Sequence, residues 1–250
     1  MTNKYMYFIA NWKMYGNSKS LNSIDKVIKF SKRYKNKKFK LIYCPPYTLL
    51  DSFSKKIKKT KIELGAQNCH FEISTGPFTG SISPMMLKSI GSKYVIIGHS
   101  ENRSTGESDF HIKNKMNSSI KSGLNIIFCI GETLKQRKRK LTNKILRKQI
   151  LKGIPRIKNL NMILIAYEPI WSIGTGIIPN LNELDKNITF IKNILKENIK
   201  IKNPKVLYGG SVNPKNVKNL ASIKSIDGFL VGGASQKAKN FIDIVKKTII

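Results

Sequence analysis

Two charged residues stand just after short apolar runs, where a buried strand would end. Glu168 follows the run Ile163–Tyr167, in a chain of 250 residues that has only 14 acidic side chains. Because a carboxylate is costly to place at the end of a hydrophobic strand, this position favours a general base. Lys13 closely follows the run Tyr7–Ala10. A fixed positive charge there would attract an anionic substrate and stabilise developing negative charge.

A histidine and a second acid follow another apolar run. His99 comes directly after such a run and one glycine, whereas His70 and His111 lie among polar residues and are expected at the surface. A histidine at a strand end serves structure more often than catalysis, so its position alone leaves both roles open. Glu101 comes two residues later, and we expect it to pair with Lys13 and orient it.

The segment after Glu168 combines a rigid start, apolar side chains and a glycine-rich end. It comprises Pro169, Ile170, Trp171, Ser172, Ile173, Gly174 and Thr175, and Gly176 follows. This composition is typical of a lid that closes over a substrate and excludes water. The alternative, an ordinary loop between a strand and a helix, would not be expected to expose a tryptophan and two isoleucines.

Paired glycines follow the last two apolar runs, in Gly209–Ser211 and Gly232–Ala234. Glycine lets backbone N–H groups come close to an anion, so these turns favour a phosphate site. One pair alone is a weak signal. Two such turns after the seventh and eighth strands lie where barrel enzymes usually bind phosphate.

Eight short apolar runs recur along the chain, and helical patterns separate most of them. The runs are Tyr7–Ala10, Lys40–Tyr43, Ile62–Ala66, Tyr94–Ile97, Asn125–Cys129, Ile163–Tyr167, Val206–Tyr208 and Gly228–Val231. Apolar runs without alternation are typical of strands buried on both faces. They predict an α/β fold, a single-domain TIM (β/α)8 barrel over residues 1–250 with eight parallel strands inside outer helices. An open doubly wound sheet is the alternative, but no G-x-G-x-x-G turn follows the first run.

The patterns between the runs also predict where helices lie and end. Ile188, Ile191, Leu195 and Ile199 form an apolar stripe at helical spacing. Ser83-Pro84 is typical of a helix start, with serine as the cap and proline at the first helical position. Gly123 is typical of a helix end.

The composition excludes several classes of protein. Apolar residues make up 40% of the chain, enough for a large core, but no run is long enough to span a membrane. The first apolar segment is too short for a signal peptide. Cys44, Cys69 and Cys129 are too widely spaced for a zinc site or a disulfide framework. We therefore expect a soluble cytoplasmic protein without a metal site.

The formal net charge of +32 raises the question of a nucleic-acid partner. The excess is nearly all lysine and is scattered along the chain, whereas base and phosphate recognition tends to use arginine. Lysine, isoleucine and asparagine all have A/T-rich codons, so compositional drift accounts for their abundance. We expect solvated helix faces, with nucleic-acid binding only as nonspecific electrostatic attraction.

Five segments together resemble the triosephosphate isomerase family. They are Asn11–Met14, Ile97–Glu101, Ala166–Gly176, Tyr208–Val212 and Asp227–Ala234, and they follow the family's order and spacing across the whole chain. The resemblance implies an intramolecular aldose–ketose isomerase of glycolysis and gluconeogenesis. Its substrates would be dihydroxyacetone phosphate and D-glyceraldehyde 3-phosphate, interconverted through an enediolate. It implies neither a metal nor an organic cofactor.

The resemblance also assigns roles to residues. It makes Glu168 the base and His99 a neutral electrophile that donates a hydrogen bond to the carbonyl oxygen, the acid–base pair for which this enzyme is a standard example. Lys13 and Asn11 would stabilise the oxyanion. The backbone N–H groups that would bind the phosphate belong to Gly174, Ser211, Gly232 and Gly233. Lid closure would keep the enediolate from losing its phosphate.

The resemblance further implies a homodimer, in which a loop after the third strand reaches the partner's active site. Gln67–Gly80 resembles that loop, and Thr79 matches the position that reaches toward the Lys13 region of the partner. The family usually has a glutamate at Ser81 and an arginine at Asn102, and these two residues pair across the dimer. Losing both leaves no unpaired charge but removes an anchor, so we expect a weakened dimer.

A different barrel enzyme with a phosphorylated substrate, such as an aldolase or a phosphoribosyl isomerase, would also explain the glycine turns. Neither explains Glu168 followed by this lid. No lysine ends the sixth run, where an aldolase would form its Schiff base.

Overall fold

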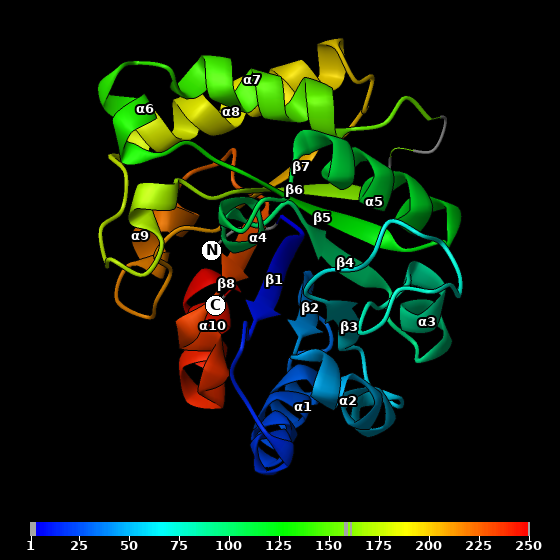
Figure 1. Cartoon of the computed structure of the whole chain (residues 1–250). Helices are drawn as coiled ribbons and strands as arrows, with labels where there is room; N and C mark the ends of the chain where they lie inside the picture. Colours follow the sequence, from blue (N-terminus) through cyan, green and yellow to red (C-terminus); the bar gives the residue numbers. More distant parts are fainter. Residues whose placement is uncertain (1–3, 158–159, 161, 250) are drawn as a thin grey trace.

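The computed structural model describes residues 4–157, 160 and 162–249, and a closed barrel of eight parallel strands forms its centre (Figure 1). The strands are β1 (Met6–Asn11), β2 (Phe39–Cys44), β3 (Glu63–Ala66), β4 (Tyr94–Ile97), β5 (Asn125–Ile130), β6 (Ile163–Tyr167), β7 (Lys205–Tyr208) and β8 (Gly228–Val231). Each strand pairs with the next in the sequence, and β1 also pairs with β8. The predicted TIM barrel is confirmed, and each predicted run coincides with a strand to within one residue at either end.

Helices surround the barrel, with α1 and α2 at the bottom of Figure 1 and α7 and α8 at the top. The α-helices are α1 (Ile24–Arg33), α2 (Leu50–Ile57), α3 (Pro84–Ser89), α4 (Ser100–Ser104), α5 (Asp109–Lys121), α6 (Leu134–Lys138), α7 (Thr142–Gly153), α8 (Leu181–Glu197), α9 (Val217–Ala221) and α10 (Ala238–Ile249). Short 3-10 helices are η1 (Ser18–Ser23), η2 (Tyr47–Leu49), η3 (Ile170–Ser172) and η4 (Gly233–Gln236). No helix of the described part of the chain is long and apolar enough to cross a membrane.

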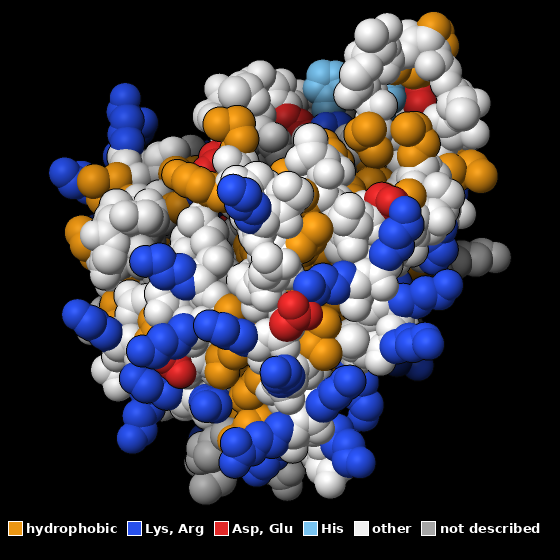
Figure 2. All heavy atoms as spheres, turned by 90° about the horizontal axis from the view of Figure 1, so that it is seen from below, with side chains coloured by type: hydrophobic (Ala, Val, Ile, Leu, Met, Phe, Trp, Pro, Cys, Tyr) orange, Lys and Arg blue, Asp and Glu red, His pale blue; other side chains and the backbone are white. Residues whose placement is uncertain are grey.

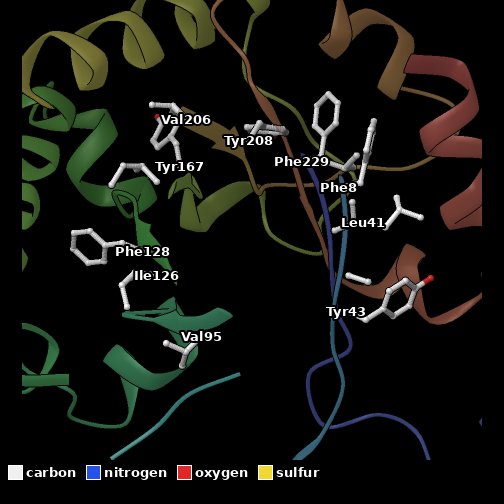
Figure 3. Packing of buried hydrophobic residues seen from close by; sticks show 14 of the residues in the cluster. Phe8, Leu41, Tyr43, Val95, Ile126, Phe128, Tyr167, Val206, Tyr208 and Phe229 are labelled. Carbon is white, nitrogen blue, oxygen red and sulfur yellow. The ribbon is translucent and has the colours of Figure 1, made fainter. Parts of the chain in front are cut away.

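Two layers of buried side chains hold this architecture together. Alternate strand residues such as Ile9, Ile127 and Leu207 form one cluster, while their neighbours pack against the helices. Figure 3 shows part of the second layer, where Phe8 and Phe229 lie close together. Burial on both faces explains why the strands lack a polar alternation in the sequence.

The predicted helix signals are confirmed at three places. Ile188, Ile191 and Leu195 of α8 are all buried, whereas the helix ends at Glu197, so the predicted stripe residue Ile199 lies beyond it. Ser83 Oγ accepts a hydrogen bond from the backbone N–H of Met86, 3.2 Å away, and so caps α3. Gly123, just beyond α5, has a φ of +75°, which glycine adopts without strain.

Candidate active site

The ends of β1, β4 and β6 bring four predicted residues into one chain of contacts. Glu168 Oε1 lies 3.6 Å from His99 Nε2, and His99 Nδ1 lies 3.6 Å from Glu101 Oε2. Glu101 Oε1 in turn lies 2.5 Å from Lys13 Nζ, so the expected ion pair is present. Glu168 and His99 are each only 4% exposed. A buried carboxylate, an imidazole and an ammonium group therefore share one mouth of the barrel.

The orientation of the His99 ring follows from its place at the start of α4. The backbone N–H of Glu101 points at His99 Nδ1 and donates to it across 3.3 Å. Because Nδ1 accepts this hydrogen bond, Nε2 is the ring nitrogen that can donate. Nε2 is the nitrogen that faces Glu168. The site thus presents an N–H donor beside the carboxylate.

Lys13 is held in an unusual backbone conformation. Its φ is +55°, a left-handed value that is uncommon for lysine. The Asn11 Oδ1 accepts from the backbone N–H of Lys13 at 3.1 Å, so the other end of this amide, the NH2 group, remains a donor. Gln67 Nε2 donates to the carbonyl oxygens of Lys13 and Cys44, each 2.8 Å away. Sequence reasoning placed Gln67 only in the dimer loop and missed this supporting role.

Glu168 occupies a space that glycine keeps open. A Cβ on Gly209 would lie 2.6 Å from Glu168 Cγ, and one on Gly131 would lie 1.8 Å from the Glu168 carbonyl oxygen. Its Oε2 is buried with no hydrogen-bond partner among the described residues. Burial and the nearby Glu168 carboxylate raise the pKa of the Cys129 thiol well above its usual range, which keeps that neighbour protonated. An unpartnered carboxylate oxygen in such a space is available to accept a proton.

The first glycine pair also has a packing role. The sequence suggests that Gly209 and Gly210 let backbone groups approach an anion, and this stays a prediction. In addition, Gly209 makes room for Glu168, and a Cβ on Gly210 would lie 2.3 Å from the Tyr208 hydroxyl and 2.6 Å from Ser172 Oγ. The sequence pattern did not reveal this requirement for space beside side chains.

Glu132 anchors the start of the candidate lid, which contains η3. Trp171 Nε1 donates to Glu132 Oε1 at 2.9 Å, and the Tyr167 hydroxyl donates to Glu132 Oε2 at 3.2 Å. Burial raises the pKa of Glu132, and these two donors partly offset that effect. Arg137 covers the indole ring, 4.4 Å from its centroid. Sequence reasoning missed Glu132, although it is an acid two residues past the end of β5.

The far end of the segment is attached to the turn after β7. Ser211 Oγ accepts from the backbone N–H of Gly176 at 3.0 Å and donates to the carbonyl oxygen of Ser172 at 2.7 Å. Ser172 Oγ also lies 2.9 Å from the Tyr208 hydroxyl. Burial raises the pKa of Tyr208 to about 12, so this hydroxyl remains protonated. The segment is therefore held at both ends over the mouth.

Of the residues expected around a phosphate, Gly232 lies next to Lys13. A Cβ on Gly232 would lie 3.6 Å from Lys13 Cε, so the turn after β8 adjoins the ammonium group. Gly233 begins η4, and Gly174 is an exposed lid residue with a φ of +73°. These glycines and Ser211 come from three separate turns that border Lys13 or the lid.

The loop after β3 exposes both Thr79 and Ser81. Apolar side chains are exposed on and near it: Met14 is 95% exposed, Tyr15 59% and Phe78 38%. His70, expected at the surface, is partly exposed, and its ring also packs against Phe71 and Phe78, with centroids 4.3 and 4.4 Å away. His111 is exposed as expected.

Comparison with known proteins agrees with this geometry. A model of the triosephosphate isomerase family matches residues 6–248. The chain is 40% identical to a triosephosphate isomerase of Thermodesulfovibrio yellowstonii, over 96% of this chain and 98% of that protein. It is 42% identical to one of Dictyoglomus thermophilum, over 95% and 97%. A crystal structure of the Bartonella henselae triosephosphate isomerase superposes with a TM-score of 0.89 at 34% identity, covering 97% of this chain and 98% of that one. The chain belongs to the triosephosphate isomerase family.

Proposed function

We propose that the mouth formed by β1, β4 and β6 is the active site where this isomerase interconverts dihydroxyacetone phosphate and D-glyceraldehyde 3-phosphate. One observation carries the proposal: the unpartnered carboxylate of Glu168 faces His99 Nε2 at 3.6 Å. A base and an N–H donor at this spacing can flank the two atoms that react, a carbon bearing an acidic proton and the neighbouring carbonyl oxygen.

Each side chain at this mouth has its own role in the proposed reaction. The Glu168 carboxylate removes a proton from the carbon next to the carbonyl, and the electron pair moves onto the carbonyl oxygen to give an enediolate. His99 donates its Nε2 proton in a hydrogen bond to that oxygen, while the Lys13 ammonium and the Asn11 amide NH2 stabilise the negative charge. Glu168 then returns the proton to the former carbonyl carbon. At the same time His99 Nε2 gives a proton to the former carbonyl oxygen and takes the hydroxyl proton from the other oxygen, where the new carbonyl forms. The atoms of substrate and product are the same, so the reaction needs no other reactant.

Backbone N–H groups provide the phosphate site in this proposal. They belong to Gly174, Ser211, Gly232 and Gly233. Neutral N–H groups hold a dianion without placing mobile cations next to the reacting carbons. The lid closes over the enediolate and keeps water out, which favours return of the proton over loss of phosphate. The contacts of Trp171 with Glu132 and of Gly176 with Ser211 support this role for the lid.

We also propose that residues 1–250 form one domain and that two copies assemble into a dimer in the cytoplasm. Pairing of β1 with β8 closes the barrel with strands from both ends of the chain, which supports a single domain. The exposed side chains of Met14, Tyr15 and Phe78 would be covered by a second copy. Thr79 on the same loop would reach the partner's active site.

A coupled isomerase assay tests the proposed role of Glu168. Glu168→Gln keeps the shape of the side chain but removes the base, and we expect kcat to fall at least about a hundredfold. Glu197→Gln, at the exposed end of α8, changes the charge equally and is the control, with wild-type kcat expected. A folded Glu168→Gln variant with near wild-type turnover would refute the proposal. A stable adduct trapped by borohydride with substrate would instead indicate aldolase chemistry.

A further inference from the structure

A basic hollow lies at the end of the barrel opposite the active site. Its volume is about 340 Å3, within the usual range for ligand sites. It is lined by Tyr5, Lys35, Lys37, Phe39, Lys40, Thr60, Lys61, Ile62, Glu63 and Lys93. These residues precede or begin β1 to β4, whereas the catalytic residues follow the strands. A ligand held here would leave the catalytic mouth free.

The charge of this hollow is only partly neutralised. Its one carboxylate, Glu63, pairs with Lys40 at 3.0 Å and with Lys93 at 3.2 Å. In the described part of the chain, Lys35, Lys37 and Lys61 form no ion pair with a carboxylate. Lys61 Nζ donates to the carbonyl oxygen of Lys35 at 3.4 Å, which links two loops into one rim. Three exposed ammonium groups are therefore available to an anion.

The basic surface continues beyond this hollow. A second hollow of about 430 Å3 shares four lining residues with the first, including Glu63 and Lys93, and adds Lys55 and Lys58. Its additional acid, Asp51, pairs with Lys55 at 2.6 Å. Figure 2 views the side of the molecule that carries α1 and α2, and lysine and arginine side chains crowd much of it with few acidic ones between them. A row of several phosphates would match this surface better than a single anion.

An aromatic ring distinguishes this surface from other lysine-rich parts of the molecule. Tyr5 lines the first hollow and is 41% exposed. Tyr7 supports the ring from the side, edge-on, with the centroids 5.4 Å apart. Surfaces that bind single strands combine a basic groove for the phosphates with aromatic rings on which bases stack. A double helix covers its bases, and a membrane surface offers only head groups, so neither would use the ring in this way.

We propose that the hollow around Tyr5, Lys35, Lys37 and Lys61 binds single-stranded nucleic acid, with a base against the tyrosine and phosphates against the lysines. This inference goes beyond general attraction by the +32 charge, because it requires one particular ring and one particular set of lysines. It is independent of the isomerase reaction, since none of these residues lies at the catalytic mouth.

Binding of a fluorescent oligothymidylate of about 15 nucleotides tests the proposal by anisotropy at several salt concentrations. The triple variant Lys35→Gln, Lys37→Gln, Lys61→Gln should bind at least about tenfold more weakly at low salt, and its salt slope should fall by about 2. Tyr5→Leu should weaken binding about fivefold or more, as expected for one lost stacking contact, with an unchanged salt slope.

The control is the triple variant Lys144→Gln, Lys148→Gln, Lys152→Gln on α7, which removes the same charge from exposed positions on another side of the molecule. It should keep most of the affinity, and all variants should keep wild-type isomerase activity. Equal losses of affinity in the two triple variants, or wild-type affinity of Tyr5→Leu, would overturn the proposal. Either result would show that binding depends on the overall positive charge and not on this hollow. Tyr5-dependent binding of anionic lipid vesicles without oligonucleotide binding would overturn it as well.

Discussion

Gly209 and Glu168 touch so closely that no methyl group fits between them, because a Cβ on Gly209 would lie 2.6 Å from Glu168 Cγ. The turn after β7 therefore fixes the position of the carboxylate that the end of β6 supplies. A base must lie within hydrogen-bond reach of the proton it removes, and a displacement of about 1 Å can cost about a hundredfold in rate. The glycine contributes to catalysis through the space that it leaves.

We expect Gly209→Ala to lower kcat about a hundredfold, because the new methyl group must push Glu168 aside. Steady-state kinetics with triose phosphate measure this loss, and circular dichroism with thermal unfolding shows whether the barrel remains intact. Gly174→Ala is a useful comparison, since an added Cβ there meets no atom within 4 Å although its φ of +73° strains the backbone. A folded Gly209→Ala enzyme with wild-type kcat would show that the turn does not position Glu168.

The hydrogen bond from Trp171 to Glu132 gives a second prediction. Trp171→Phe keeps an aromatic ring but removes the N–H donor, which is 2.9 Å from Glu132 Oε1. A hydrogen bond to a charged group contributes about 1.5–3 kcal/mol to the stability of the state that contains it. Without this bond, the ratio of closed to open lid should fall at least about tenfold. We expect kcat to fall and more of the substrate to lose its phosphate. Release of inorganic phosphate during turnover, measured beside isomerisation, checks both effects, and unchanged partitioning would contradict the role of this bond.

The barrel could be predicted because its strands are buried on both faces. Runs such as Tyr94–Ile97 and Ile163–Tyr167 match β4 and β6 residue for residue. A strand covered by helices outside and by other strands' side chains inside needs apolar residues throughout, and this pattern is local. The rule that chemistry gathers at strand ends then placed Glu168, His99 and Lys13 at one mouth, as the structure has them.

The supporting contacts could not be predicted in the same way. Gln67 contacts Lys13, which is 54 residues away in the sequence, and Trp171 contacts Glu132, which is 39 residues away. Such pairs depend on where separate loops meet, which periodicity does not encode. The stacking of His70 between two phenylalanines was missed because its neighbours in the sequence suggested a polar surface.

Asp227 should make the stability of the protein sensitive to acid. It is buried at the base of the barrel, 2.7 Å from both Lys4 Nζ and Lys192 Nζ. Burial alone would raise its pKa, but these lysines and the backbone N–H of Val206 hold the pKa below its usual range. A lowered pKa in the folded state means stabilisation that is present above about pH 4, the pKa in the unfolded chain, and lost as pH falls further.

Asp227→Asn should therefore be less stable than the wild type at pH 7 by about 1–3 kcal/mol, because it leaves the partly exposed Lys4 and Lys192 without the buried carboxylate. The gap should begin to narrow near pH 4 and continue to narrow as pH falls through the lowered pKa of the folded carboxyl, where the wild-type side chain also becomes neutral. Urea unfolding followed from pH 7 to pH 3 measures both enzymes. A gap that stayed constant over this range would show that the loss comes from packing and not from the charge of Asp227.

The proposed dimer offers the last prediction. By the resemblance to the family, Ser81 and Asn102 stand where a glutamate and an arginine would pair across the proposed interface. The double variant Ser81→Glu, Asn102→Arg should restore that pair, and it occurs twice in a two-fold dimer. An exposed ion pair contributes about 0.2–1 kcal/mol, so two of them should tighten the dimer roughly two- to thirtyfold. Sedimentation equilibrium over a range of protein concentrations measures the change.

The single variants decide whether the gain comes from pairing. Ser81→Glu alone lowers the net charge of each +32 subunit, so it reduces repulsion between subunits without making a new pair. Asn102→Arg alone adds to that repulsion and should weaken the dimer. Since the two charges cancel, the double variant has the wild-type net charge, and any gain in affinity beyond the sum of the single effects measures the ion pair itself. Additive effects would show that the two side chains lie too far apart to pair in the proposed dimer.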